Sequence, residues 1–304
     1  MRAARRPGGC LTVAVSSEAQ SPTPAAVAMV IGSIISIQIG SAIAVNLFSD
    51  VGAAGVVFMR ALVSAVLLVV IWRPGFRIPK RDRKVTLLFG IALAGVNLFF
   101  YESIARIPLG TAVTFEFLGP LTVALITSPR RRDWLWAGLA AAGILLLTGG
   151  IGGDDLDPVG VACALVAAFF WGAYILLGKR LGQQAAGGKG LAVAMTIAAV
   201  LTAPTGIIDG GMELFDPTVI LIGIVVGILS SAIPFSLELE AMRRLPSNVF
   251  GVMMSIEPGV AAIVGFLILG QGVVPTEIVA IALVIVASSG AIWSSSNAPP
   301  PLET

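Results

Sequence analysis

Long apolar stretches separated by short polar segments dominate the pattern of this chain. A helix that crosses the hydrocarbon core of a bilayer needs about 20 predominantly apolar residues. Ten stretches approach this length, over residues 25–47, 52–72, 85–105, 109–129, 134–151, 158–178, 190–208, 218–241, 247–269 and 275–293. The pattern therefore predicts ten transmembrane helices, of which the fifth is the shortest.

The charges between these stretches sort by side. Lysine and arginine fall before the first stretch and after the second, fourth, sixth and eighth, and only Arg60 and Arg106 depart from this rule. The opposite connections are acidic and include Asp50, Asp154 and Asp209. Because basic residues are enriched in cytoplasmic loops, we expect both termini in the cytoplasm.

An internal repeat appears when the chain is shifted by 138 residues. The shift superimposes identical residues without a gap: Glu102 on Glu240, Arg106 on Arg244, Pro108 on Pro246, Pro120 on Pro258 and Ala124 on Ala262. Chance similarity between apolar stretches is the alternative, but the retention of both prolines favours duplication. Since each half has an odd number of helices, the second half must be inverted relative to the first, as in many secondary transporters.

The predicted fold class is an all-α membrane protein with ten transmembrane helices as two inverted five-helix repeats. We expect the first repeat over 25–151 and the second over 158–293. Disordered cytoplasmic tails are expected over 1–24 and 294–304, the latter being rich in serine and proline. The apolar patch in the first tail is short for a signal peptide, so a targeting role is the less favoured alternative there.

Composition agrees with a protein that lies in lipid. Hydrophobic residues make up 57% of the chain and charged residues 12%, whereas soluble proteins average about 25% charged residues. The net charge is +2 and no basic block could follow a phosphate backbone. We therefore expect the lipid bilayer as a partner and no nucleic acid.

The residue types present exclude most catalytic chemistry. The sequence has no histidine, which removes Ser-His-Asp and Cys-His catalysis and HExxH zinc sites. Its two cysteines, Cys10 and Cys163, are far apart and lack the spacing of metal ligands. The sequence therefore predicts no enzyme, no cofactor and no metal, and a proton relay would have to use carboxylates.

Two glutamates at helix ends each precede an arginine by four residues. Glu102 is followed by Arg106 and Glu240 by Arg244. This spacing places both groups on one helix face. We expect ordinary ion pairs at both positions.

Glu116 and Glu257 lie well inside apolar stretches, without a basic residue one turn away. A charge at a helix centre costs about 2.5–3.5 kcal/mol on insertion scales, so such residues usually face a polar cavity or a partner. Under the repeat, Glu257 falls on Gly119, one helical turn beyond Glu116. We expect each half to send one carboxylate toward a shared solute site. The alternative is a protonated glutamate that is hydrogen-bonded to a neighbouring helix.

Further polar groups lie inside the apolar stretches. Arg60 needs a partner there, and Glu116, Glu238 and the carboxylate of a solute are the alternatives. Glu238 either lines the same cavity or lies at its cytoplasmic mouth. The remaining candidates for a polar lining are Gln38, Asn97, Tyr101, Trp171 and Tyr174. Packing is the alternative for each of them, and Trp171 also fits an anchor at the membrane interface.

These features resemble the drug/metabolite transporter superfamily, EamA type, over roughly residues 25–293. Within it the chain is most similar to the bacterial inner-membrane threonine/homoserine exporter group. The segments that carry the resemblance are Ser36–Gln38, Arg60, Asn97–Tyr101, Pro108–Gly110, Glu116–Pro120, Pro234–Glu238, Leu245–Pro246 and Ser255–Pro258. The chain departs from the group at Gln271, where relatives commonly have a glutamate, and at Val45, where they often have a lysine.

The resemblance implies a secondary transporter of the bacterial inner membrane that exports a small neutral amino acid such as threonine or homoserine. Because burial in an apolar interior generally raises the pKa of a carboxyl group, proton antiport through an intramembrane glutamate is the expected mechanism. Export of other solutes, such as nucleosides or aromatic compounds, is one alternative. A lipid-handling or structural membrane protein is another, and the oligomeric state stays open.

Overall fold

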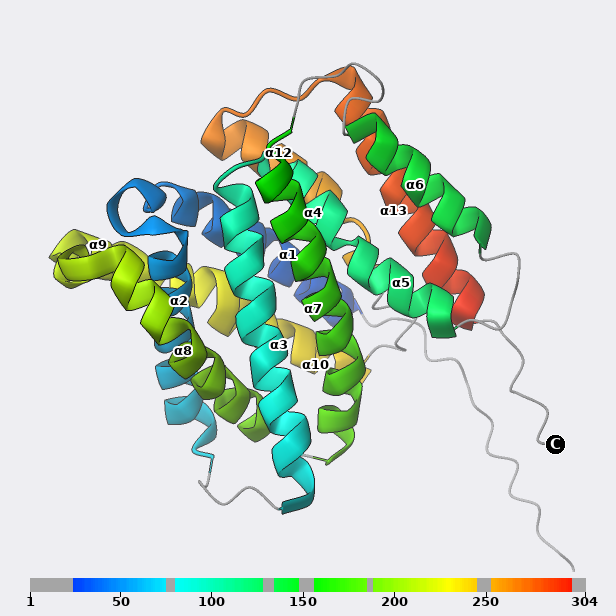
Figure 1. The fold of residues 1–304 in the computed structure, drawn as a ribbon. Coiled ribbons are helices and arrows are strands. Elements are labelled where there is room, and N and C mark those ends of the chain that lie inside the picture. The colour runs from blue at the N-terminus through cyan, green and yellow to red at the C-terminus, as the bar shows by residue number, and fades with distance from the viewer. Residues whose placement is uncertain are drawn as a thin grey trace, which may run out of the picture.

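The chain folds as a bundle of helices (Figure 1). The computed structural model describes residues 24–74, 80–127, 134–147, 156–184, 188–244 and 253–296, and all regular structure in these ranges is helical. Six helices are long and apolar enough to cross a membrane, and four shorter apolar helices accompany them. This is the pattern of a multi-pass membrane protein. The predicted tails lie outside the described residues, apart from Pro24 and 294–296.

The first half of the chain follows the predicted apolar stretches with one difference. Its helices are α1 (Pro24–Val45), α2 (Phe48–Trp72), α3 (Lys80–Ile104), α4 (Leu109–Glu116), α5 (Leu118–Thr127) and α6 (Trp134–Leu147). The helix predicted over 109–129 is interrupted by one turn residue, Phe117, between α4 and α5. Pro120 has no N–H to donate to the carbonyl of Glu116, and its ring crowds that turn.

The second half has two comparable interruptions. Its elements are α7 (Pro158–Gln184), α8 (Lys189–Gly210), the 3₁₀ turn η2 (Gly211–Phe215), α9 (Pro217–Gly227), the π-helical turn η3 (Ile228–Ala232), α10 (Ile233–Arg244), α12 (Glu257–Leu269) and α13 (Pro275–Ser296). The segment predicted as one helix over 218–241 runs continuously through η3. The stretch predicted over 247–269 has a turn at 255–256 before α12 begins.

A glycine fixes the start of the regular part of α2. Gly52 has φ +66°, and a Cβ there would lie 2.0 Å from Oδ2 of Asp209, which leaves room only for glycine. The same Oδ2 accepts a hydrogen bond from the backbone N–H of Ala54 (3.2 Å). The carboxylate of Asp209 on α8 therefore caps the first regular turn of α2.

Two other acidic residues of the connections begin helices. Oδ1 of Asp216 accepts hydrogen bonds from the N–H groups of Thr218 (2.7 Å) and Val219 (3.3 Å) at the start of α9. These two donors hold the pKa of the Asp216 carboxyl below its usual value. Asp157 caps α7 in the same way through Val159, so both residues act as N-caps.

The two halves of the chain are interleaved. α2 packs on α8, α3 on α7, α6 on α13, α1 on α10 and α4 on α12, so each of these pairs joins one helix from each half. The main apolar core forms between them and buries side chains such as Ile34, Leu109 and Phe115. The halves therefore form a single body around a common interior.

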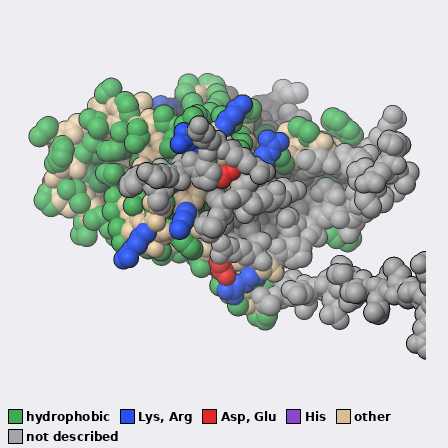
Figure 2. All heavy atoms as spheres, turned by 90° about the horizontal axis from the view of Figure 1, so that it is seen from below, with side chains coloured by type: hydrophobic (Ala, Val, Ile, Leu, Met, Phe, Trp, Pro, Cys, Tyr) green, Lys and Arg blue, Asp and Glu red, His purple; other side chains and the backbone are tan. Residues whose placement is uncertain are grey.

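Basic side chains gather at one end of the bundle. The C-terminal ends of α2 and α7 and the N-terminal ends of α3 and α8 meet there (Figure 1). Figure 2 views this end, and lysine and arginine side chains are prominent on it. Arg73, Arg83, Arg180 and Lys189 belong to these helix ends. The side of the membrane that this face meets stays a prediction.

Candidate functional site

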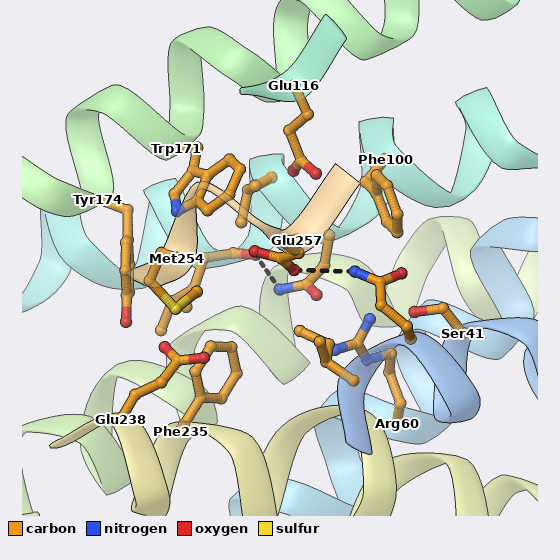
Figure 3. Close-up of a pocket in the computed structure, with 15 residues that line it drawn as sticks. Ser41, Arg60, Phe100, Glu116, Trp171, Tyr174, Phe235, Glu238, Met254 and Glu257 are labelled. Atoms are coloured by element: carbon orange, nitrogen blue, oxygen red, sulfur yellow. Dashed lines mark hydrogen bonds between the residues drawn. The ribbon is translucent and has the colours of Figure 1, made fainter. Parts of the chain in front are cut away.

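A polar cavity lies inside the bundle, with a volume of about 70 Å³. Side chains from α1, α2, α3, α4, α7, α10 and the segment that leads into α12 line it (Figure 3). Eight of the nine predicted site residues are among them: Gln38, Arg60, Asn97, Glu116, Trp171, Tyr174, Glu238 and Glu257. The ninth, Tyr101, is fully buried beneath Arg60. The structure thus brings these side chains together, while their role stays a prediction.

Three carboxyl groups converge on the cavity. Glu116 projects from the last turn of α4, Glu257 from the first turn of α12 and Glu238 from α10 (Figure 3). Each is more than nine-tenths buried. Glu257 benefits from its place at a helix N-terminus, where unpaired N–H groups favour negative charge.

The break in each half lies next to one of these glutamates. Pro120 leaves the carbonyl of Glu116 without its helical N–H partner, and Pro258 does the same to the carbonyl of Met254. These two pairs of residues correspond under the 138-residue shift. Both Glu116 and Met254 line the cavity. Each break therefore supplies a backbone acceptor as well as a side chain near the cavity wall.

Glu257 has one fixed partner. The amide Nε2 of Gln38 on α1 donates a hydrogen bond to its Oε1 (2.9 Å). Because a carboxylate accepts hydrogen bonds and the amide nitrogen donates them, this contact also fixes which way the Gln38 amide faces. α1 and α12 are thereby joined at the cavity.

Arg60 is paired with neutral groups of the π-helical turn. Its Nε donates to Oγ of Ser231 (3.0 Å), and its Nη2 donates to the same oxygen (2.8 Å) and to the carbonyl of Ser230. Its guanidinium also lies over the ring of Tyr101, 4.8 Å from the centroid. Neither Glu116 nor Glu238 forms an ion pair with Arg60 among the described residues.

Pro234 explains why these partners are available. A proline has no N–H, so the carbonyls of Leu229 and Ser230, five and four residues earlier, lack a helical donor from this position. Oγ of Ser36 on α1 donates to the first (2.6 Å) and Arg60 on α2 donates to the second. Ser230 and Ser231 were not among the predicted site residues, although the proline downstream is a signal for such freed carbonyls.

A glycine lets α1 approach this turn. A Cβ on Gly40 would lie 2.8 Å from both Cβ and N of Ser230. On the other side, the hydroxyl of Ser64 on α2 shares its proton between the carbonyl of Arg60 in its own helix (2.7 Å) and the carbonyl of Gly227 (3.0 Å), the residue before the turn. The π-helical turn is therefore held between α1 and α2 by side chains that satisfy its backbone.

The aromatic candidates form the remaining wall. Trp171 lies edge-on to Phe117 with ring centroids 4.8 Å apart, and Tyr174 stacks on Phe89 at 4.9 Å. Both Trp171 and Tyr174 line the cavity. Asn97 turns its Nδ2 back to the carbonyl of Leu93 (2.6 Å).

The other two glutamates lie outside the cavity, as predicted. Glu102 and Arg106 form an ion pair of 2.6 Å, and so do Glu240 and Arg244. Both pairs are partly exposed, where such contacts contribute about 0–1 kcal/mol. The hydrogen bond from Arg106 to Glu102 raises the pKa of the arginine.

Gln271, one of the two departures from the family pattern, also has a defined contact. Its Oε1 accepts the backbone N–H of Leu109 (3.1 Å), the first residue of α4. The side chain thus joins the segment after α12 to the start of α4. Among the described residues no three histidine, cysteine, aspartate or glutamate side chains form a group that could hold a metal ion.

Comparison with known proteins finds a family match and relatives that agree with each other. The EamA-like transporter family matches residues 158–293. The threonine/homoserine exporter RhtA of Escherichia coli (strain K12) is 41% identical over 257 residues, which is 84% of this chain and 87% of the relative. RhtA of Salmonella typhimurium (strain LT2) is 39% identical over 87% of this chain and 90% of the relative.

A solved crystal structure has the same fold. It superimposes with a TM-score of 0.62 and covers 88% of this chain and 98% of the other, at 18% sequence identity. At this level of identity the match supports only the arrangement of the helices.

Proposed function

Because the chain belongs to the EamA-like transporter family, we propose that it exports small neutral amino acids such as threonine or homoserine across the bacterial inner membrane. The relatives that carry this function in their names are 39–41% identical over most of both chains. Such a likeness supports an amino acid as the solute. It leaves the preferred amino acid to experiment.

The polar cavity is the observation that carries the proposal. A neutral amino acid in water is a zwitterion, so a site for it needs groups that meet both charges and a small apolar part. The cavity places Glu257 and Arg60 among apolar side chains such as Leu93 and Phe100. Buried charges in a membrane interior commonly mark a solute or ion pathway.

An inverted repeat supports transport by alternating access. The break at Phe117 and the turn at 255–256 coincide under the 138-residue shift, and so do the ion pairs that begin at Glu102 and Glu240. Solute sites of transporters with such repeats lie near the midplane between the halves. We propose ten transmembrane helices, both termini in the cytoplasm and the basic face on that side.

Proton antiport is the proposed driving reaction. The chain has no histidine, so a proton carried through the interior must use a carboxyl group. Glu116 and Glu257 are buried in the cavity wall without an arginine or lysine in ion-pair contact among the described residues. Each could take up a proton from one side and release it to the other when the cavity changes its opening.

Efflux from proteoliposomes tests both the solute and the coupling. Liposomes that contain the purified chain are loaded with labelled threonine or homoserine, and a proton gradient is imposed. We expect Glu116→Gln and Glu257→Gln each to lower gradient-driven efflux by at least about tenfold, because glutamine keeps the shape of the side chain but cannot carry a proton.

Glu213→Gln is the matched control, because Glu213 is exposed in η2 and should leave efflux unchanged. Unchanged efflux in both cavity variants would refute the proton mechanism. If wild-type liposomes release neither amino acid but release another labelled solute, the alternative cargo on the same fold is correct. Release of no solute at all would favour the lipid-handling or structural alternative.

A further inference from the structure

Three buried polar atoms on the cavity wall have no hydrogen-bond partner. They are Oε1 of Gln38, Oγ of Ser41 and Oε2 of Glu257. The three side chains are 2%, 1% and 5% exposed and all line the cavity. Buried polar groups are nearly always paired, so a group of unpaired ones calls for an absent partner.

Ser41 differs in this respect from most hydroxyl side chains of the bundle. Thr114, Thr202 and Ser236, for example, each donate to the carbonyl four residues earlier in their own helix. Ser41 makes no such bond, although it lies in the regular part of α1. It lies one turn beyond Gln38, on the same helix face.

All three atoms can accept hydrogen bonds, and one belongs to a carboxyl group that carries negative charge once it has released its proton. Oε2 belongs to the carboxylate of Glu257, and Oε1 of Gln38 can only accept, because the nitrogen of that amide is already bonded to Glu257. A hydroxyl oxygen such as Oγ of Ser41 accepts as well. A carboxylate would be repelled here, and a hydroxyl group has a single proton to offer. A primary ammonium group offers three donors and the complementary charge.

We propose that Gln38, Ser41 and Glu257 form the subsite that binds the ammonium group of the exported amino acid. This inference rests on the proposed function and adds the orientation of the solute. Arg60 is the basic side chain among the described residues that line the cavity, so the carboxylate of the solute points toward α2. The ammonium group then bridges α1 and α12, the two helices that the Gln38–Glu257 contact already joins.

Competition binding on the purified full-length chain tests this subsite. Labelled threonine is displaced by unlabelled threonine or by 2,3-dihydroxybutanoate, in which a hydroxyl group replaces the ammonium group. We expect the second compound to compete about 10- to 150-fold more weakly with wild-type protein, the range for hydrogen bonds to a charged group.

Ser41→Ala should weaken threonine binding by about 3- to 10-fold and leave the affinity for 2,3-dihydroxybutanoate unchanged. The ratio of the two affinities should therefore fall. Ser288→Ala is the matched control. Oγ of Ser288 is also buried and unpaired, but this residue lies on α13 away from the cavity lining, so both affinities should stay at wild-type values.

The outcomes separate this inference from the proposed function. Absence of threonine and homoserine binding in the wild-type protein would refute the amino-acid exporter itself. Binding of threonine with equal competition by the ammonium-free compound, or an unchanged ratio in Ser41→Ala, would refute the ammonium subsite and leave the exporter intact. Either of the two results that refute the subsite would mean that ordered water fills the three positions.

Discussion

Arg60 shows how a charge can be stabilised in this interior without a carboxylate. Its partners are a carbonyl freed by Pro234, the hydroxyl of Ser231 and the face of Tyr101. The planar guanidinium fits this set because its donors point in fixed, separate directions. The residue therefore holds the π-helical turn in place and also contributes a positive charge to the cavity.

A lysine at this position should fail to replace the arginine. Its single ammonium group cannot reach both oxygens of the turn in the same geometry, and it loses the stacking on Tyr101. We expect Arg60→Lys to lower the free energy of unfolding by about 1.5–3 kcal/mol, measured by thermal unfolding in detergent micelles. Arg106→Lys, which keeps an exposed ion pair with Glu102, should change it by no more than about 1 kcal/mol. Equal losses in the two variants would contradict this role.

The sequence predicted which residues carry charge into the interior but not what Arg60 contacts. Glu116, Glu238 and Glu257 are conspicuous because they interrupt apolar stretches. The partners of Arg60 lie about 170 residues away and are a backbone carbonyl and a serine, neither of which stands out in a hydropathy pattern. The unpaired hydroxyl of Ser41 was missed for the same reason.

At the scale of helices, the existence of each apolar segment was predictable and its interruptions were not. Hydropathy reports whether a residue favours water or an apolar environment, and it is unaffected by how the backbone pairs its hydrogen bonds. The break at Phe117 and the π-helical turn Ile228–Ala232 both occur inside stretches that are apolar on average. Pro120 and Pro234 were the available signals, since each removes one donor from the helix.

The contact of α1 with the π-helical turn depends on a missing side chain. Gly40→Ala would bring a Cβ to 2.8 Å from the backbone N of Ser230, so α1 has to move away and the bond from Ser36 to Leu229 has to lengthen. We expect a loss of about 1–3 kcal/mol in stability, the range for overpacked interiors, together with slower efflux.

Gly138→Ala in α6 is the control, because a Cβ at Gly138 meets no atom within 4 Å. Alanine has the higher helix propensity, so this variant should be stabilised by about 0.5–1 kcal/mol. Thermal unfolding of the two purified variants beside the wild type gives the comparison. A gain of stability in both would show that α1 is loosely packed at Gly40.

At the scale of the whole molecule, we expect the end of the bundle opposite the basic face to be the closed one. α4 and α12 pack together toward the end opposite the basic face (Figure 1), where Gly110 lies against Ala262. Gln271 adds the hydrogen bond to the N–H of Leu109. We expect a solute that leaves the cavity at this end to have to separate these two helices.

Removal of the Gln271 contact should loosen the closed end. In a background with both native cysteines replaced by serine, a cysteine is introduced by Asn97→Cys on the cavity wall and its labelling by a membrane-impermeant thiol reagent is timed. We expect Gln271→Leu to speed labelling from this end by about three- to tenfold, since one hydrogen bond is lost. Gln271→Glu keeps an acceptor at a helix N-terminus and should label slowly. Equal rates in the two variants would show that the contact does not hold this end closed.

We expect three departures from regular α-helical hydrogen bonding beside the cavity to act as joints. The joints lie at Phe117, at residues 255–256 and at Ile228–Ala232. Because a proline (Pro120, Pro258 or Pro234) removes one backbone hydrogen bond near each joint, the helix on one side can tilt while the helix on the other side keeps its packing. The closed end would then open when short helices tilt about the buried carboxylates, and complete helices would not have to slide through the lipid.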